Sequence, residues 1–262
     1  MTTAENLNRI IQAKADIKTA IENKGVAVGD ITIDGYVEKI NQITVGESGK
    51  TVLPNGLVFS GSTWETFDMG EYDWSDVYSF SGLFYACNNL KRIDNFPSDI
   101  VPYCSTRYMF HKTNLEEAPY FDMRNIGDTL SMFYATNITT IPQYDMNNVR
   151  TVEQMFFECA NLTKLPLLNW ESVVLTTSCF VGCSSLTTVG GFQNLKAKLE
   201  LSSSPLTDES VSNIINYVYD FTANAETPDS TQGTLKLKLD VYNRISDELK
   251  ALATSKGWTI TA

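Results

Sequence analysis

Apolar residues between positions 73 and 194 recur at an almost constant interval. Five phenylalanines are separated by 26, 23, 23 and 24 residues, and Leu, Met or Cys stands directly before each of them: Phe84, Phe110, Phe133, Phe156 and Phe180. Two further apolar positions follow in every unit, the first at Leu90, Leu115, Ile138, Leu162 and Leu186. One such unit cannot bury its own apolar face. The pattern therefore predicts stacked units that share a continuous core, a β-solenoid.

Smaller side chains keep the same register. The third residue after each phenylalanine is Cys or Thr, and Asn or Ser stands before the first aliphatic residue, as in Asn89, Asn114, Asn137 and Asn161. Asp or Asn precedes each phenylalanine by eleven positions. Because a tightly curved chain leaves backbone groups to satisfy, we expect the asparagines to point inward and bond to them. The Cys positions fit a narrow interior, and we expect free thiols.

The first 45 residues have a helical period. Thr2 and Glu5 form a capping box, and a second, shorter helix is predicted from Asp34. Two short helices make too small a core to be stable alone, so we expect them to anchor the chain and to oligomerise. The residues expected to do so are Leu7, Ile10, Ile17, Ile21, Tyr36 and Ile40. Residues 46–72 are interpreted as a linker and the entry to the solenoid.

The last 68 residues, 195–262, lose the repeat and alternate between strand and helix patterns. A first strand is predicted over 195–201, and a helix follows Thr207. Leu235, Leu237 and Leu239 indicate a second strand, Asp240 begins a second helix, and 258–261 is a last strand. This β-α-β-α-β segment is expected to cap the solenoid and cover its open edge.

The repeated order of Met-Phe, Cys, Leu, Leu-Pro, Asp and Val from Asp73 to Val189 resembles the BspA-like leucine-rich repeats of bacterial surface proteins and gut phages. The resemblance implies a binding or adhesion scaffold. The phrase Ala-Asp-Ile-Lys-Thr-Ala-Ile-Glu-Asn-Lys-Gly, followed by Tyr36 and Ile40, resembles N-terminal modules of bacteriophage fibre and appendage proteins, including those of gut Bacteroidetes phages. The expected fold is α/β: an N-terminal helical anchor (1–45), a linker (46–72), a short leucine-rich-repeat-type β-solenoid (73–194) and a cap (195–262).

Charge narrows the choice of partners. The net charge is −11, of which −8 falls between residues 51 and 195, and there is no block of Lys or Arg. Such a surface repels nucleic acid and anionic lipid. Neither an apolar run of membrane-spanning length nor a secretory signal is recognisable, so we expect no membrane insertion and synthesis in a cytoplasm.

Catalytic chemistry has few candidates. His111 is the single histidine, and it shares a repeat position with aromatic residues, which favours a role in packing. No nucleophile elbow, phosphate loop or zinc motif occurs. The acidic cluster Asp68, Glu71, Asp73 and Asp76 lacks the spacing of a calcium loop. We therefore predict no catalytic residue, no metal and no cofactor, with a carboxylate-based glycan-degrading enzyme as a weaker alternative.

Binding is the stronger candidate activity, because a column of side chains on stacked units can form a ladder. The ligand-binding candidates are Tyr85, His111, Tyr134 and Phe157, each directly after a repeat phenylalanine. Facing solvent, they would stack on sugar rings or meet a partner's apolar patch. Facing inward, they would form a second core column, and the sequence leaves both open.

These observations predict a bacteriophage virion structural protein, a head or tail fibre or appendage on the virion surface that is made in the host cytoplasm. Other virion proteins are the expected partners of the N-terminal module, and host-surface glycan or protein is the expected ligand. We expect a homo-oligomer, with a trimer as the preferred state. The alternative is a bacterial cell-surface adhesin, which would need a signal peptide and an anchor.

Overall fold

The computed structural model describes residues 17–19, 50–53, 58–74, 77–97 and 105–262. The chain divides into two compact units, Met1–Leu53 with Glu71–Asp76, and Pro54–Gly70 with Val77–Ala262. In the first unit, β1 (Thr51–Val52) pairs in parallel with β3 (Tyr72–Asp73). Ile17 lies in a helical stretch and is 43% exposed. The other expected anchoring residues, Leu7, Ile10, Ile21, Tyr36 and Ile40, lie outside the described residues.

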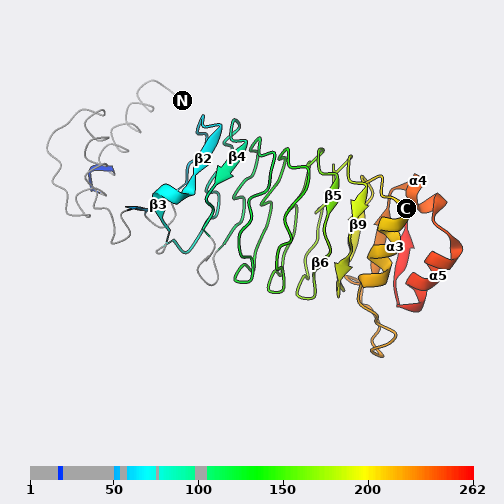
Figure 1. Cartoon of the computed structure of the whole chain (residues 1–262). Helices are drawn as coiled ribbons and strands as arrows, with labels where there is room; N and C mark the ends of the chain where they lie inside the picture. Colours follow the sequence, from blue (N-terminus) through cyan, green and yellow to red (C-terminus); the bar gives the residue numbers. More distant parts are fainter. Residues whose placement is uncertain (1–16, 20–49, 54–57, 75–76, 98–104) are drawn as a thin grey trace, which may run out of the picture. The chain divides into compact units, whose positions relative to one another are not determined.

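The second unit is mixed α/β, with few helices and small parallel sheets. Successive turns of the chain lie side by side across it (Figure 1). Its repeated part holds β2 (Thr66–Asp68), the 3-10 helix η1 (Met69–Glu71, which runs into the first unit), β4 (Arg92–Asp94), β5 (Lys164–Leu165), β6 (Leu168–Asn169), β7 (Thr188–Val189) and β8 (Phe192–Gln193). The parallel pairs β2–β4, β5–β7 and β6–β8 each join a turn to the next one.

Backbone hydrogen bonds join the turns around each repeat phenylalanine. The Phe110 N–H donates to the Met132 carbonyl of the following turn, and the Phe133 N–H donates to that of Met155, both at 2.9 Å. The amide directly before each of these phenylalanines donates within its own turn, as the Met132 N–H does to the Thr129 carbonyl at 3.1 Å. Local and inter-turn bonds thus alternate along the chain, so a segment without regular strands still pairs its backbone groups.

This alternation requires left-handed backbone on both sides of each phenylalanine. Positive φ angles recur two residues before and two residues after it: Gly82, Ala86, Tyr108, Lys112, Ser131, Ala135, Gln154, Glu158, Ser178 and Gly182. For an L-residue this conformation costs roughly 1–2 kcal/mol, and only Gly82 and Gly182 avoid the cost. Packing and inter-turn hydrogen bonds must offset it elsewhere.

One turn begins earlier than the sequence indicates. The Phe59 N–H donates to the Leu83 carbonyl at 2.6 Å, which is the register of the later turns, and the Phe59 ring lies 5.8 Å from that of Phe84. Phe67 pairs with Ile93 in the β2–β4 ladder. Residues 58–70, expected to belong to the linker and solenoid entry, therefore form an additional turn of the stack. The sequence does contain a signal for this turn, because the 25-residue spacing from Phe59 to Phe84 matches the spacing of the repeat.

The core is a column of rings. Phe59 and the five repeat phenylalanines follow one another with ring centroids 5.3–5.9 Å apart. Phe84 and the four after it have no exposed surface, and the Met side chains before Phe110, Phe133 and Phe156 are equally buried. Each turn thereby completes the core of its neighbours, as the sequence pattern predicted.

The Cys and Thr column lies inside this core. Cys159 donates from Sγ to the Phe133 carbonyl at 2.9 Å, and Cys183 donates to that of Phe156 at 3.1 Å. Cys87, Cys159, Cys179 and Cys183 are free and buried, as expected. Burial raises the pKa of Cys159 to about 11 and raises the pKa values of Cys179 and Cys183 further. These thiols therefore serve packing and hydrogen bonding.

The asparagine column does not point inward, contrary to expectation. Asn89, Asn114, Asn137 and Asn161 are exposed. Asn161 donates to the Asn137 side-chain oxygen at 3.3 Å, and Asn137 donates to that of Asn114 at 3.2 Å. Asn89 donates to the Thr63 backbone carbonyl of the preceding turn at 3.4 Å, as expected of the asparagines. The other three amides bond to one another along the outside because the Cys and Thr column already donates to the interior carbonyls.

The C-terminal segment forms a three-stranded parallel sheet in the order β11–β10–β9. Its elements are β9 (Leu199–Leu201), α3 (Asp208–Tyr217), β10 (Thr234–Leu237), α4 (Leu239–Arg244), α5 (Asp247–Ser255) and β11 (Thr259–Thr261). Thr207 caps α3 as predicted, accepting from the Ser210 N–H. Leu239 is 63% exposed in α4 and does not extend β10. The expected second helix is broken, because Ile245 is extended and Ser246 caps α5.

Candidate binding surface

The four aromatic residues expected to bind a ligand form one continuous stack. Ring centroids are 4.8 Å apart between Tyr85 and His111, 4.3 Å between His111 and Tyr134, and 4.7 Å between Tyr134 and Phe157. The interplanar angles of 6°, 21° and 10° make each contact face to face. The inter-turn hydrogen bonds set this spacing, since each ring follows its repeat phenylalanine by one residue.

The stack neither faces solvent fully nor lies inside the core, the two orientations that the sequence left open. Tyr85 is 40% exposed, Tyr134 and Phe157 are half-buried, and His111 is 9% exposed. Its rings thus line the boundary of the core and present their edges to solvent. A ring that is stacked on both sides offers no face to a sugar, so the expected stacking cannot occur on His111 or Tyr134.

Among the described residues, the free face of the stack is at Tyr85. The register of the Gly61 N–H with the Tyr85 carbonyl places Ser60 at the equivalent position of the preceding turn, where there is no ring. At the opposite end, the equivalent position beyond Phe157 is Val181. The surface therefore combines one open aromatic face with a stripe of ring edges.

His111 is held in the stack as a neutral imidazole. Burial, and secondarily the charge of Lys112, lowers its pKa below the ordinary 6.5, and the Ser131 backbone partly opposes this shift. Tyr108 approaches the imidazole edge-on at 5.8 Å. Within the described chain, Nδ1 of His111 has no hydrogen-bond partner. A ring covered on both faces, whose Nδ1 has no partner among the described residues, fits packing better than acid–base catalysis.

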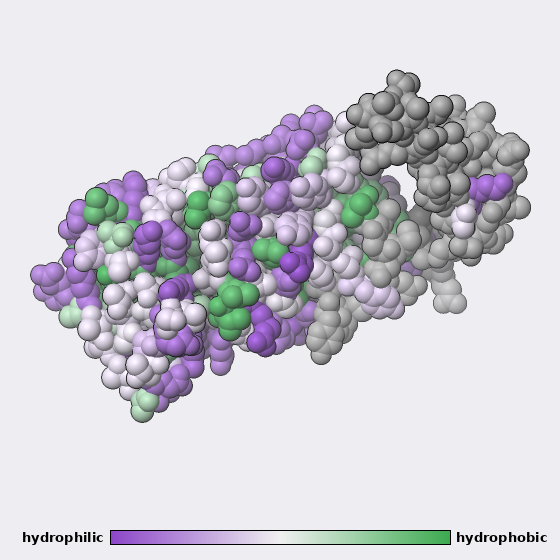
Figure 2. All heavy atoms as spheres, turned by 180° about the vertical axis from the view of Figure 1, so that it is seen from behind, coloured by the Kyte–Doolittle hydropathy of each residue, from purple (hydrophilic) through white to green (hydrophobic). Residues whose placement is uncertain are grey.

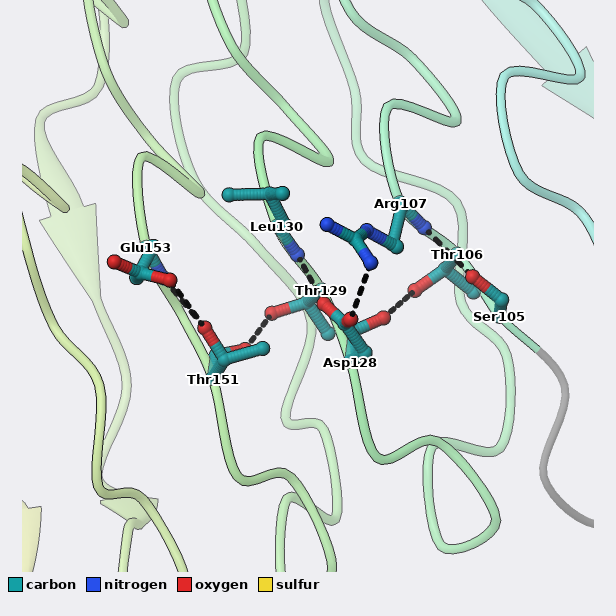
Figure 3. A network of polar contacts seen from close by, with 8 residues as sticks. All are labelled: Ser105, Thr106, Arg107, Asp128, Thr129, Leu130, Thr151 and Glu153. Carbon is teal, nitrogen blue, oxygen red and sulfur yellow. Dashed lines mark hydrogen bonds and ion pairs between the residues drawn. The ribbon is translucent and has the colours of Figure 1, made fainter.

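A polar ladder fixes the turns that lead into the stack (Figure 3). The Asp128 side chain accepts from the Leu130 N–H at 3.0 Å and pairs with Arg107 at 3.4 Å. The Thr129 hydroxyl donates to the Thr151 carbonyl of the next turn at 2.8 Å. Ser105, Thr106, Thr151 and Glu153 continue the pattern in the neighbouring turns. These bonds close each turn locally and bind it to its neighbour.

Apolar side chains are also exposed outside the stack. The face in Figure 2 has small hydrophobic areas separated by hydrophilic ones. Tyr78 and Tyr120 are 58% and 66% exposed, and neither occupies the position of the stack in its turn. In the part of the chain that is described, no three His, Cys, Asp or Glu side chains are grouped as metal ligands. No helix there is long and apolar enough to cross a membrane.

Comparison with known proteins gives one family. The model described as "Mycoplasma protein of unknown function, DUF285" matches residues 55–170 and 104–198, two overlapping segments that together span more than half of the chain. The matched region includes the additional turn at Phe59 and all four rings of the aromatic stack. No curated protein and no solved structure matches the chain.

Proposed function

Because the chain belongs to the family of Mycoplasma proteins of unknown function, DUF285, we propose that its stacked turns are a BspA-like leucine-rich-repeat solenoid that attaches to a cell-surface glycan or protein. A non-catalytic scaffold fits the chemistry of the described residues. The single histidine is covered in a stack, and the buried thiols of Cys159, Cys179 and Cys183 have raised pKa values.

The aromatic stack at the surface is the observation that carries this proposal. A row of ring edges that follows four turns suits an elongated partner surface better than a small enclosed ligand. Tyrosine also contributes an apolar body and a hydroxyl at low entropic cost, which suits recognition. The open face of Tyr85 would receive one sugar ring or one flat apolar group at the end of the row.

We propose display on a bacteriophage head or tail fibre or appendage as the setting, with the N-terminal module binding other virion proteins and forming a trimer. The resemblance of residues 15–25 to phage fibre modules supports it. A bacterial cell-surface adhesin is the second candidate, and the family description, which names a bacterium, favours it. Mass spectrometry of purified phage particles and of a bacterial surface fraction distinguishes the two, because the protein should be found in only one.

The attachment claim is tested with labelled full-length protein and intact host cells in flow cytometry. Replacing Tyr85 and Tyr134 with alanine together should reduce the bound fluorescence at least tenfold, since the stack loses its open face and two of its edges. Tyr120→Ala is the matched control, because this tyrosine is more exposed and lies outside the stack. Equal attachment of both variants, with unchanged circular dichroism, would refute the proposal.

A further inference from the structure

One face of the C-terminal sheet is not covered by any helix of the described chain. Leu199, Leu201, Leu235 and Leu237 point to one side and are at most 2% exposed. Both crossovers advance in the same direction, from β9 to β10 to β11, and crossovers of one hand then lie on one face. The opposite side keeps Lys198, Glu200 and Lys236 at least partly exposed. A parallel sheet normally has helices on both faces, so an open one calls for an explanation.

A groove of about 280 Å³ lies on this open face. The strand residues Glu200, Lys236 and Thr261, with Lys198 directly before β9, form one part of it, and Thr177 and Ser178 of the last repeat turn form another. The register places Glu200 beside Lys236, and Lys236 beside Thr261, so one row crosses all three strands. The volume is close to the lower limit for small-ligand sites, which suits a ligand of monosaccharide size.

The groove is locally positive on an acidic protein. It contains two ammonium groups and one carboxylate, against a net charge of −11 for the chain. Lys236 is already paired with Glu200 at 3.0 Å, and this contact lowers the pKa of the Glu200 carboxyl. Lys198 forms no ion pair within 4.0 Å in the described chain. The pKa of Asp229 is lowered mainly by its hydrogen bonds from Thr231, and the charge of Lys198 is the smallest contribution. Lys198 is therefore the cation available to a ligand.

Hydroxyl groups line the same groove as that cation. The side chains of Thr177, Ser178 and Thr261 make no hydrogen bond to protein within the described residues. Three free hydroxyls and the Glu200 carboxylate offer donors and acceptors to a polyol, and Lys198 offers one positive charge. Glu200 would repel a dianion such as a phosphate monoester, whereas a single carboxylate can be paired.

We infer that this groove binds a sugar bearing one carboxylate, that is, a uronic acid unit. Lys198 pairs with the carboxylate, and Thr177, Ser178, Thr261 and Glu200 bond to the sugar hydroxyls. This site is separate from the aromatic stack, and it can exist whether or not the stack attaches to a cell surface.

The test is a titration of the full-length protein, followed by two-dimensional NMR of its backbone amides. The probes are sodium glucuronate, neutral methyl β-glucopyranoside, and sodium acetate, which supplies charge without hydroxyls. Glucuronate should shift the amides of Thr177, Lys198, Lys236 and Thr261 in a saturable manner. The two other probes should bind about tenfold more weakly, because each lacks one class of contact.

Variants separate the groove from general charge effects. Lys198→Gln should weaken glucuronate binding about tenfold. Lys164→Gln is the matched control, since this exposed lysine lies on β5 away from the groove, and the affinity should not change. The inference is overturned by absent glucuronate binding, by equal binding of the glucopyranoside, or by an unchanged affinity in Lys198→Gln. Loss of cell attachment in the Tyr85 and Tyr134 variant would not bear on any of these results.

Discussion

Removal of one ring from the middle of the core column should destabilise the whole stack of turns. Phe133 has no exposed surface and is stacked between Phe110 at 5.3 Å and Phe156 at 5.9 Å. A buried phenylalanine removes about 200 Å² from water, worth about 5 kcal/mol at 25 cal/mol per Å². Alanine retains a small part of that area, and the cavity cannot collapse because the turns are fixed by inter-turn hydrogen bonds. We expect Phe133→Ala to lower the free energy of unfolding by about 4–5 kcal/mol.

Urea denaturation followed by tryptophan fluorescence and by circular dichroism measures this loss, and the two probes should change together. Tyr134→Ala is the neighbouring control. This ring is half-buried and belongs to the surface stack, so it should cost only about 1–2 kcal/mol. A loss below about 1.5 kcal/mol for Phe133→Ala, or equal losses for both variants, would contradict a continuous core shared by the turns.

Other consequences of the structure can be measured separately. Lys112→Gly should stabilise the protein by about 0.5–1 kcal/mol, because Lys112 is exposed with a φ of 57°; a destabilised variant in thermal denaturation would argue against the left-handed assignment. The imidazole resonance of the single histidine should titrate in NMR with a pKa below 6.5, and a midpoint at or above that value would oppose its burial. Since the folded state disfavours protonation of His111, its contribution to stability is complete above the unfolded pKa and decreases as the pH falls. A thiol reagent at pH 8 should leave Cys159, Cys179 and Cys183 unmodified until urea unfolds the chain, whereas rapid reaction of the native protein would show that they are accessible. Thr207→Ala should cost about 1 kcal/mol, measured by urea denaturation, through loss of the α3 cap, and no change would mean that the Ser210 amide finds another acceptor.

Sequence reasoning was most successful where one residue type served one purpose in every turn. The phenylalanine column, the Met residues before it and the buried Cys and Thr positions all follow from apolar spacing, because the burial of large side chains restricts which residues fit. Thr207 was predictable for a similar reason, since a hydroxyl before an amphipathic segment is a local cap signal.

The remaining features depend on tertiary geometry that residue types do not encode. Most of the residues with left-handed backbone, such as Tyr108 and Gln154, are not glycine, so the sequence does not indicate where the backbone becomes left-handed. The prediction that the asparagine side chains point inward was wrong, because the Cys side chains donate to the interior carbonyls instead. The aromatic stack was predicted as a column, but the covering of its faces follows from ring orientation. The groove near Lys198 joins three strands and a repeat turn, and no sequence motif connects them.

Hydroxyl-radical footprinting of the tyrosines tests attachment through the aromatic stack most directly. Labelled full-length protein is oxidised free and while bound to host cells, and the modification of each tyrosine is measured by mass spectrometry. The account predicts that Tyr85, which is 40% exposed, and its half-buried neighbour Tyr134 become protected on binding, whereas Tyr120 at 66% exposure is modified to the same extent in both states. Protection of Tyr120 with unchanged modification of Tyr85 and Tyr134 would contradict the account.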